Sequence, residues 1–298
     1  MRRLLFIAVI FLFHSCEDVI DVDVPTEAPR LVVDAVLRVD RDLPFVPVEV
    51  KVSETSDFFS NNTPTQLENA IIFYGVPLPN APEIFEEVFS SSLAESEPGS
   101  GIYVPDPNFS SDQRMQTQNV VPGTVFLLQL QHKGRFYSAR TEYVPTVPID
   151  MLEQGDQTLF DEDDTEVRVT ITDTPDVNNF YVFDFGFGEF QALEDQFFQG
   201  QEFEFSYFYD ENLQPGQEIT VSILGANQEF FNYIDLLVEQ TEDTGGVFEP
   251  PVTTARGNVF DVTDLDNIDV FDNVEQPDVF ALGYFAVVQE FRSSITIE

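Results

Sequence analysis

The chain has 298 residues, 43% of them hydrophobic, so it can bury a sizeable core and has room for two domains of ordinary size. Its 54 acidic side chains outnumber the 13 basic ones, which gives a formal net charge of −41. This charge excludes nucleic-acid binding, because affinity for nucleic acid comes from phosphates neutralised by Lys and Arg. It also argues against direct adhesion to an anionic lipid surface.

Residues 1–15 have the layout of a lipoprotein signal peptide. Arg2 and Arg3 form a positive segment, residues 4–13 form an apolar run, and Ser15 precedes the only cysteine, Cys16. This layout predicts that the leader is removed and that the Cys16 thiol is acylated, which would anchor the chain to a membrane. The alternative is an ordinary secretory signal with Cys16 near the junction by chance, but a free thiol would then remain on an exported chain.

Residues 16–29 are expected to form an acidic tether between this anchor and the first strand. Glu17, Asp18, Asp21 and Asp23 follow the cysteine closely. A solvated spacer explains such a segment. The functional interpretation is an export signal, because acidic residues just after a lipidated cysteine resemble the surface-export signal of Bacteroidota lipoproteins.

Strand patterns and turn signals dominate residues 30–147. Residues 31–39 read as a buried strand, and apolar residues alternate with polar ones over residues 46–52, as in a half-buried strand. We place that second strand at a sheet edge because it contains Pro47. Further strands are expected over residues 70–74, 101–103, 125–130 and 134–139. Their order, with a Pro-Gly turn before the long strand, resembles immunoglobulin-like and transthyretin-like modules, so we expect an N-terminal β-sandwich.

Residues 148–298 are expected to form a second β-rich domain. The predicted strands cover residues 166–172, 179–187, 203–209, 218–224, 279–288 and 291–297. One helix is expected near residues 227–240, where Asn227 can cap the first turn and apolar residues fall on one stripe. The chain is therefore predicted to be mainly β, with two β-sandwich-like domains and one short amphipathic helix in the C-terminal half.

Few residues in the chain could carry catalysis. His132 is the only histidine left after the leader is removed, and we expect it to be exposed beside a hairpin turn. Zinc sites of the usual kind lack ligands, and no phosphate-binding or dinucleotide-binding loop is present. A glycosidase-like carboxylate pair remains an alternative, because counting acids cannot exclude one. We therefore predict no enzymatic activity and assign no catalytic residue.

An acidic stretch near the C-terminus is the candidate metal site. Asp261, Asp264, Asp266, Asp269 and Asp272 recur every two or three residues, with Asn258, Asn267 and Asn273 among them. Such an oxygen-rich segment suits Ca²⁺, although the spacing and the central glycine of an EF-hand are missing. The alternative is a solvated loop in an acidic protein. Calcium is the one cofactor that the sequence suggests.

Several short motifs along the mature chain resemble one bacterial family. They are the segments at residues 16–25 and 29–35, Gly101-Ile102-Tyr103, Pro122-Gly123-Thr124, Phe230-Phe231-Asn232-Tyr233-Ile234, Phe248-Glu249-Pro250-Pro251, Asn267 and Leu282-Gly283-Tyr284-Phe285-Ala286. Together they are similar to the Bacteroidota lipoproteins called domain of unknown function 4249. This sequence departs from them in its extreme charge and in a longer acidic insertion between Pro251 and Leu282. The family has no assigned activity, so the resemblance implies no catalytic or binding residues.

The resemblance does imply an address and a class of partner. Lipoproteins of this kind are often encoded beside TonB-dependent receptors, so we expect an outer-membrane, lipid-anchored protein that faces the cell exterior. Its expected role is a non-enzymatic accessory that captures substrate for such a receptor or closes it as a lid. The alternative is a calcium-binding structural or adhesive surface lipoprotein. Aromatic residues in loops, Phe58, Phe59 and Phe109, are candidates for ligand contact, although loop packing is their default interpretation.

Overall fold

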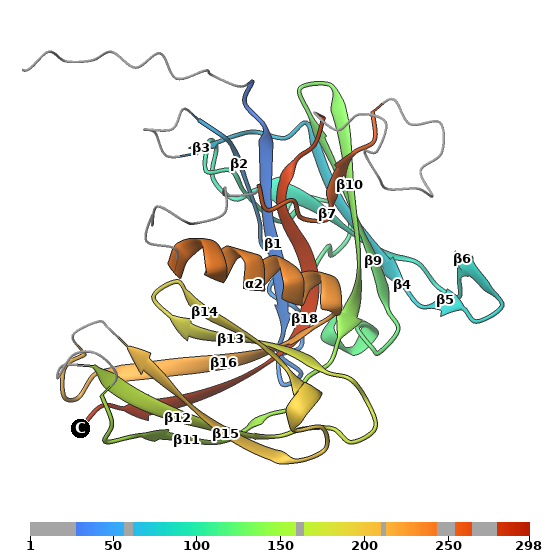
Figure 1. Cartoon of the computed structure of the whole chain (residues 1–298). Coiled ribbons are helices and arrows are strands. Elements are labelled where there is room, and N and C mark those ends of the chain that lie inside the picture. Colours follow the sequence, from blue (N-terminus) through green and yellow to red (C-terminus); the bar gives the residue numbers. More distant parts are fainter. Residues whose placement is uncertain (1–27, 57–61, 159–163, 210–212, 243–253, 264–278) are drawn as a thin grey trace, which may run out of the picture.

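The computed structural model describes residues 28–56, 62–158, 164–209, 213–242, 254–263 and 279–298 (Figure 1). Within these residues the chain is mainly β, with one α-helix, as the sequence predicts. Two short 3₁₀ turns complete the regular structure, at Thr117–Asn119 and Asp195–Phe197.

Eight strands close into a mixed barrel, because the last strand of the chain lies between the first and the tenth. The order around the barrel is β18–β1–β2–β8–β7–β4–β9–β10, and β10 pairs again with β18. β18 runs parallel to β1 and to β10, and the other neighbouring pairs are antiparallel. The strands are β1 (Leu31–Val39), β2 (Val50–Glu54), β4 (Asn69–Gly75), β7 (Phe89–Glu95), β8 (Ile102–Pro105), β9 (Val125–His132), β10 (Arg135–Val144) and β18 (Leu282–Thr296).

Three smaller elements decorate the barrel. β3 (Thr63–Pro64) pairs with β2, and β17 (Val259–Asp261) pairs with β10. β5 (Pro77–Leu78) and β6 (Ala81–Phe85) form a separate hairpin that projects from the barrel (Figure 1). Side chains fill the barrel interior: alternate residues of β1 from Leu31 to Val39 are buried and join one hydrophobic cluster with side chains of β4 and β9.

Two expectations for the N-terminal half need correction. The predicted sandwich is a barrel, because a strand from the other end of the chain closes it, and no local turn signal announces that pairing. The alternating burial over residues 46–52 is confirmed, but the strand begins only at Val50. It also lies between β1 and β8 rather than at an edge, and Pro47 precedes it.

The rest of the chain forms two sheets that face each other across an aromatic core. One sheet contains β13 (Phe180–Gly186), β14 (Glu189–Glu194), β16 (Glu218–Ala226) and the second half of β18. The other contains β11 (Ile149–Gln154), β12 (Thr165–Thr172) and β15 (Glu202–Tyr209). The predicted aromatic face of β15 is confirmed: the ring of Tyr207 stacks on Phe185, and Phe205 meets Phe183 edge to face.

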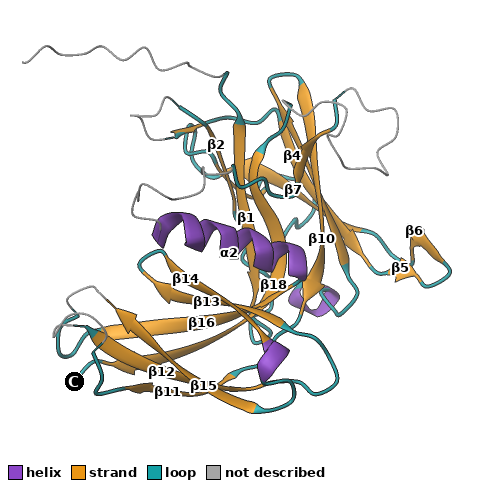
Figure 2. Cartoon of the chain, in the orientation of Figure 1, coloured by secondary structure: helices purple, strands orange, loops and turns teal. Residues whose placement is uncertain are grey.

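The predicted helix is also confirmed as α2 (Gln228–Glu242), which covers the outer face of the β13–β14–β16 sheet (Figure 2). The Oδ1 atom of Asn227 accepts a 2.8 Å hydrogen bond from the backbone N–H of Phe230, so Asn227 caps the helix as expected. Phe230 and Ile234 face inward and pack with side chains of β13, β16 and β18.

β18 is one continuous strand, whereas the sequence predicts two strands separated near residues 289–290. Its first half pairs with β1 from Leu282 to Gln289, and its second half pairs with β16 from Glu290 to Thr296. No turn-forming residue stands between the halves, so the chain changes partners without breaking. The boundary expected at residue 147 falls between β10 and β11, while β18 belongs to both the barrel and the C-terminal sheet.

Charged side chains meet where β18 changes partners. Glu290, whose side chain is 1% exposed, accepts from Arg38 Nη1 at 3.1 Å and lies 2.5 Å from Arg292 Nη2. Arg38 also donates to Asp184 Oδ2 at 2.6 Å. This group, the Glu290 cluster, joins β1, β13 and β18.

We expect Glu290→Ala to destabilise the fold by about 2–4 kcal/mol, since it removes the buried partner of two guanidinium groups that keep some exposure to water. Glu153→Ala is the matched control, because Glu153 pairs with Arg168 at a site where both side chains are well exposed. That change should cost about 1 kcal/mol or less. Urea unfolding measures both variants, and equal losses would contradict the role of the cluster.

A second prediction concerns acid sensitivity at Glu166 on β12. This buried carboxylate accepts from Ser206 Oγ at 2.6 Å and from the backbone N–H of Gln157 at 2.8 Å. These hydrogen bonds, that of Ser206 first, hold the pKa of Glu166 below its ordinary value of 4.5. The ionised group therefore stabilises the fold above that value, and the contribution disappears as the pH falls through the lowered pKa.

As the pH is lowered from 6 towards 3, we expect the free energy of unfolding to fall less in Glu166→Gln than in the wild type. The difference between the two losses should be on the order of 1 kcal/mol. Denaturant unfolding at a series of pH values measures this. Glu202→Gln, at an exposed position on the neighbouring strand, should keep the wild-type slope. Identical slopes in the wild type and Glu166→Gln would refute the assignment.

Candidate functional site

Most residues of the predicted sites lie outside the described part of the chain. These are Cys16, Phe58, Phe59, Asp264, Asp266, Asp269 and Asp272. Phe109 is 48% exposed on a loop and lines neither of the cavities described below. Among the described residues, no three His, Cys, Asp or Glu side chains are placed to hold a metal ion. The calcium site therefore stays a prediction.

Two members of the predicted calcium segment have other partners. Asp261 is 7% exposed: its Oδ2 atom accepts from Arg135 Nε at 2.5 Å and its Oδ1 atom from Thr263 Oγ1 at 2.6 Å. The amide of Asn258 bonds the backbone of Arg140 and of Phe285. Both side chains attach the segment around β17 to the barrel.

The expected exposure of His132 is wrong, since only 4% of this residue is exposed. Its Nδ1 atom lies 2.9 Å from the carbonyl oxygen of Gln66, and its Nε2 atom lies 3.0 Å from Glu54 Oε1. Lys133 Nζ also reaches Glu54, at 2.5 Å, and this hydrogen bond is the main cause that lowers the pKa of Glu54. Because Glu54 supplies a partner at the end of β2, the imidazole can be buried, and it serves to hold the β9–β10 turn in place.

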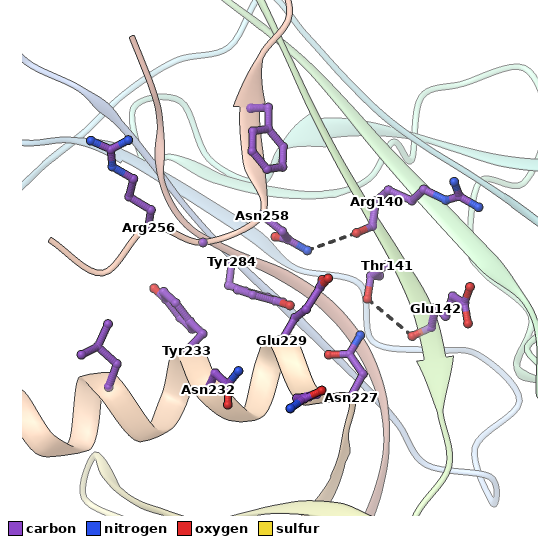
Figure 3. Close-up of a pocket in the computed structure, with 14 residues that line it drawn as sticks. Arg140, Thr141, Glu142, Asn227, Glu229, Asn232, Tyr233, Arg256, Asn258 and Tyr284 are labelled. Atoms are coloured by element: carbon purple, nitrogen blue, oxygen red, sulfur yellow. Dashed lines mark hydrogen bonds between the residues drawn. The ribbon is translucent and has the colours of Figure 1, made fainter. Parts of the chain in front are cut away.

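A cleft of about 860 Å³ separates the first half of α2 from the barrel (Figure 3). We call it the α2 cleft. One wall is the helix, from its cap at Asn227 to Leu236, and the other is formed by Arg140, Thr141, Glu142 and the segment from Arg256 to Phe260. Tyr284 of β18 lies between the walls. The volume of the cleft is within the range of about 300–1,000 Å³ that is common for small-molecule sites.

The barrel wall of the cleft exists because β10, on its edge opposite β9, lacks a strand partner over three residues. β10 pairs with β17 up to Ala139 and with β18 from Tyr143 onward. Between these points the side chain of Asn258 replaces the missing ladder: Nδ2 donates to the carbonyl oxygens of Arg140 and Phe285, and Oδ1 accepts from the Phe285 N–H. Gly257 is required here, since a Cβ atom would lie 1.6 Å from the carbonyl oxygen of Gly283.

Tyr284 lies deep in the cleft with an unpaired hydroxyl group. The residue is 4% exposed, and its Oη atom has no hydrogen-bond partner within the described structure. Its ring packs against Phe230 and Tyr233, with centroids 5.2 and 4.9 Å apart. Burial first, and then the negative charge of Glu229, raise the pKa of this phenol, so it stays protonated at neutral pH.

Both signs of charge line the α2 cleft. Arg140 and Arg256 form no ion pair with any described residue, although acids greatly outnumber bases in the chain. The guanidinium carbon of Arg256 lies 3.8 Å from the centroid of Phe280, and that of Arg30 lies 3.9 Å from the same ring. Glu229 and Glu142 supply carboxylates, and Gln228 and Asn232 supply amides.

A second cavity, of about 1,020 Å³, lies on the other side of α2. It is formed by the second half of the helix with β14 and β15, and most of its lining is apolar: Phe190, Phe208, Ile234, Leu237 and Val238. The Oε1 atom of Gln191 is buried there without a hydrogen-bond partner among the described residues. This cavity therefore combines a large apolar surface with polar side chains of which some already have partners, Ser206 with Glu166 and Tyr207 with Glu189.

The sequence profile of one family, described as Domain of unknown function (DUF4249), matches residues 17–294. The chain belongs to this family. No curated protein matches it. Among solved structures it is similar to the crystal structure of red sea bream transglutaminase, at 8% identity and a TM-score of 0.22. That match covers 68% of this chain and only 30% of the transglutaminase chain, and a likeness this weak carries no argument.

Of the two cavities described above, the α2 cleft of this DUF4249 chain is the better candidate for a binding site. Its polar groups converge from three elements that strand pairing and helix packing hold in place, and one of them is a buried donor that lacks an acceptor. Such groups give a site specificity, whereas an apolar lining alone does not.

The described residues also include no helix long and apolar enough to cross a membrane.

The unpaired hydroxyl of Tyr284 leads to a stability prediction. We expect Tyr284→Phe to raise the free energy of unfolding by about 1 kcal/mol, because it removes a buried donor without a partner. Tyr181→Phe is the matched control: Tyr181 is 1% exposed, but its hydroxyl donates to Asp173. That variant should lose about 1–3 kcal/mol. Denaturant unfolding compares the two, and a loss of similar size in both would show that the Tyr284 hydroxyl has a partner.

Proposed function

We propose that this chain is a non-enzymatic binding protein, anchored by lipid at Cys16 to the outer membrane and exposed to the cell exterior. It serves a TonB-dependent receptor as a component that captures substrate or closes over it. The α2 cleft is the observation that supports the binding role, since polar side chains from α2 and the barrel line it and the buried hydroxyl of Tyr284 within it has no hydrogen-bond partner among the described residues. The signal-peptide layout and the acidic tether support the location.

Two further features favour binding over catalysis. His132, the only histidine of the mature chain, is buried, is hydrogen-bonded to Gln66 and Glu54, and lines neither cavity. The acids of the α2 cleft, Glu142 and Glu229, stand on opposite walls and are both exposed, so neither has the desolvated environment of a general acid.

The test is a purification of tagged protein from crosslinked, intact cells of the bacterium that encodes it, followed by identification of the membrane proteins recovered. We expect stoichiometric recovery of a TonB-dependent receptor with the wild type. Cys16→Ser should lose palmitate labelling, leave the membrane fraction and recover no receptor.

One outcome would overturn the accessory role: a wild-type protein that is labelled by palmitate and degraded by external protease on intact cells, yet recovers no receptor. The calcium-binding adhesive role would then take first place. Thermal unfolding with millimolar Ca²⁺, and with Mg²⁺ as the control ion, would examine that alternative.

A further inference from the structure

We infer that the α2 cleft binds a zwitterionic ligand, a short peptide with free termini. Its ammonium group lies between Glu229 and the hydroxyl of Tyr284, and its carboxylate lies at Arg256. This inference deepens the binding role proposed above and rests on it.

The deep end of the cleft suits a cation that can donate hydrogen bonds. The Tyr284 hydroxyl is buried and unpaired, and Glu229, on the first turn of α2, acts on it electrostatically. The side chain of Glu229 makes no hydrogen bond or ion pair with the described residues, and it is exposed, so it can move aside to admit a ligand. An ammonium group would donate to the hydroxyl oxygen of Tyr284 and to the carboxylate of Glu229 at once. An anion in this position would be repelled by Glu229.

Aromatic rings strengthen the preference for a cation at this end. Tyr233 packs against the ring of Tyr284 and adds a second aromatic side chain to the lining of the cleft. The faces of such rings carry negative potential and attract a ligand cation. Figure 3 shows Tyr233, Glu229 and Tyr284 together between the helix and the barrel wall.

Arg256, by contrast, suits an anionic group of the ligand. Its guanidinium group stacks on Phe280, which orients the group, and Arg30 stacks on the same ring. Arg256 has no carboxylate partner in the described part of the protein, so its planar edge is free to form two parallel hydrogen bonds with a carboxylate.

The middle of the cleft matches the polar groups of a peptide backbone. Gln228 and Asn232 are exposed side-chain amides on the helix wall, and each can both donate and accept a hydrogen bond. An uncharged polyol could use the amides as well, but it would leave the charges of Glu229 and Arg256 without partners. The charges at the two ends therefore favour a ligand with both termini ionised.

The test is calorimetric titration of the lipidated, detergent-solubilised protein with oligoalanines of two to five residues at neutral pH and low salt. We expect at least one of them to bind. N-acetylation or C-terminal amidation of that peptide should weaken binding by about tenfold each, since each removes one charged end. Maltotriose, an uncharged polyol of similar size, should not bind.

Three variants assign the ends of the ligand. Glu229→Gln should weaken the free peptide about tenfold and abolish the effect of N-acetylation, whereas Glu239→Gln, at an exposed position on the same helix outside both cavities, should change nothing. Arg256→Gln should abolish the difference between the free acid and the amide. Tyr284→Phe should weaken binding while the protein remains at least as stable.

The inference is overturned if no oligoalanine binds at 10 mM, if the blocked peptides bind as well as the free one, or if maltotriose binds instead. Its failure is distinguishable from that of the proposed function. Recovery of the receptor without peptide binding would remove the inference alone. Peptide binding without a receptor would confirm the ligand and overturn the accessory role alone.

Discussion

The continuity of β18 is the constraint on which the rest of the structure depends. Its first half completes the barrel between β1 and β10, and its second half is the edge of the C-terminal sheet beside β16. One strand thus carries the hydrogen-bond ladders of both units, and neither unit can shift along it without breaking its own pairing. Glu290 occupies the first position after the change of partners, and its carboxylate binds Arg38 from the barrel and Arg292 from the sheet side. A buried charge there can be satisfied only when both units are in place.

The α2 cleft follows from this arrangement. α2 packs on β13 and β16, which belong to the C-terminal sheet, and also on Tyr284, Ala286 and Val288 from the first half of β18. The opposite wall belongs to the barrel, where Asn258 bridges β10 and β18. The width of the cleft is therefore set by the same strand that joins the units. A change in the Glu290 cluster would alter the position of the helix wall relative to the barrel wall, although Glu290 itself does not line the cleft.

Local patterns in the sequence predicted the local structure well. The strand over residues 31–39, the aromatic face of β15 and the cap at Asn227 all depend on residues a few positions apart, and all three are confirmed. The barrel was not predictable in the same way, because β1 and β18 are about 250 residues apart in the chain and a parallel pair needs no turn. The continuous β18 was missed since Gln289 and Glu290 read as polar residues between two apolar runs. Glu290 can be buried at the junction because Arg38 from β1 and Arg292 from β18 itself both reach its carboxylate.

The candidate site was less visible in the sequence than the fold. Tyr284 and Glu229 look like an ordinary buried aromatic residue and an ordinary helix-terminal acid, and only their placement leaves a hydroxyl without a partner. Conversely, Asp261 and Asn258 supply the oxygen atoms that a calcium site needs, yet Arg135, Thr263 and the backbone of Phe285 occupy them. Residue type gives the chemistry that is available, but not which groups the fold has already engaged.

The few basic residues of this acidic chain fall into two groups, those that have an acidic partner and those that have none. In a chain with a net charge of −41, a cation without an acidic partner is unexpected, because 54 acidic side chains are available to 13 basic ones. Most basic side chains do have one: Arg38 and Arg292 bind Glu290, Arg135 binds Asp261, and Lys133 binds Glu54. Arg140 and Arg256 have none among the described residues, and both stand on the barrel wall of the α2 cleft. We infer that these guanidinium groups attract an anionic group from outside the chain, and that the exposed carboxylate of Glu229 on the facing wall attracts a positive group of the same molecule.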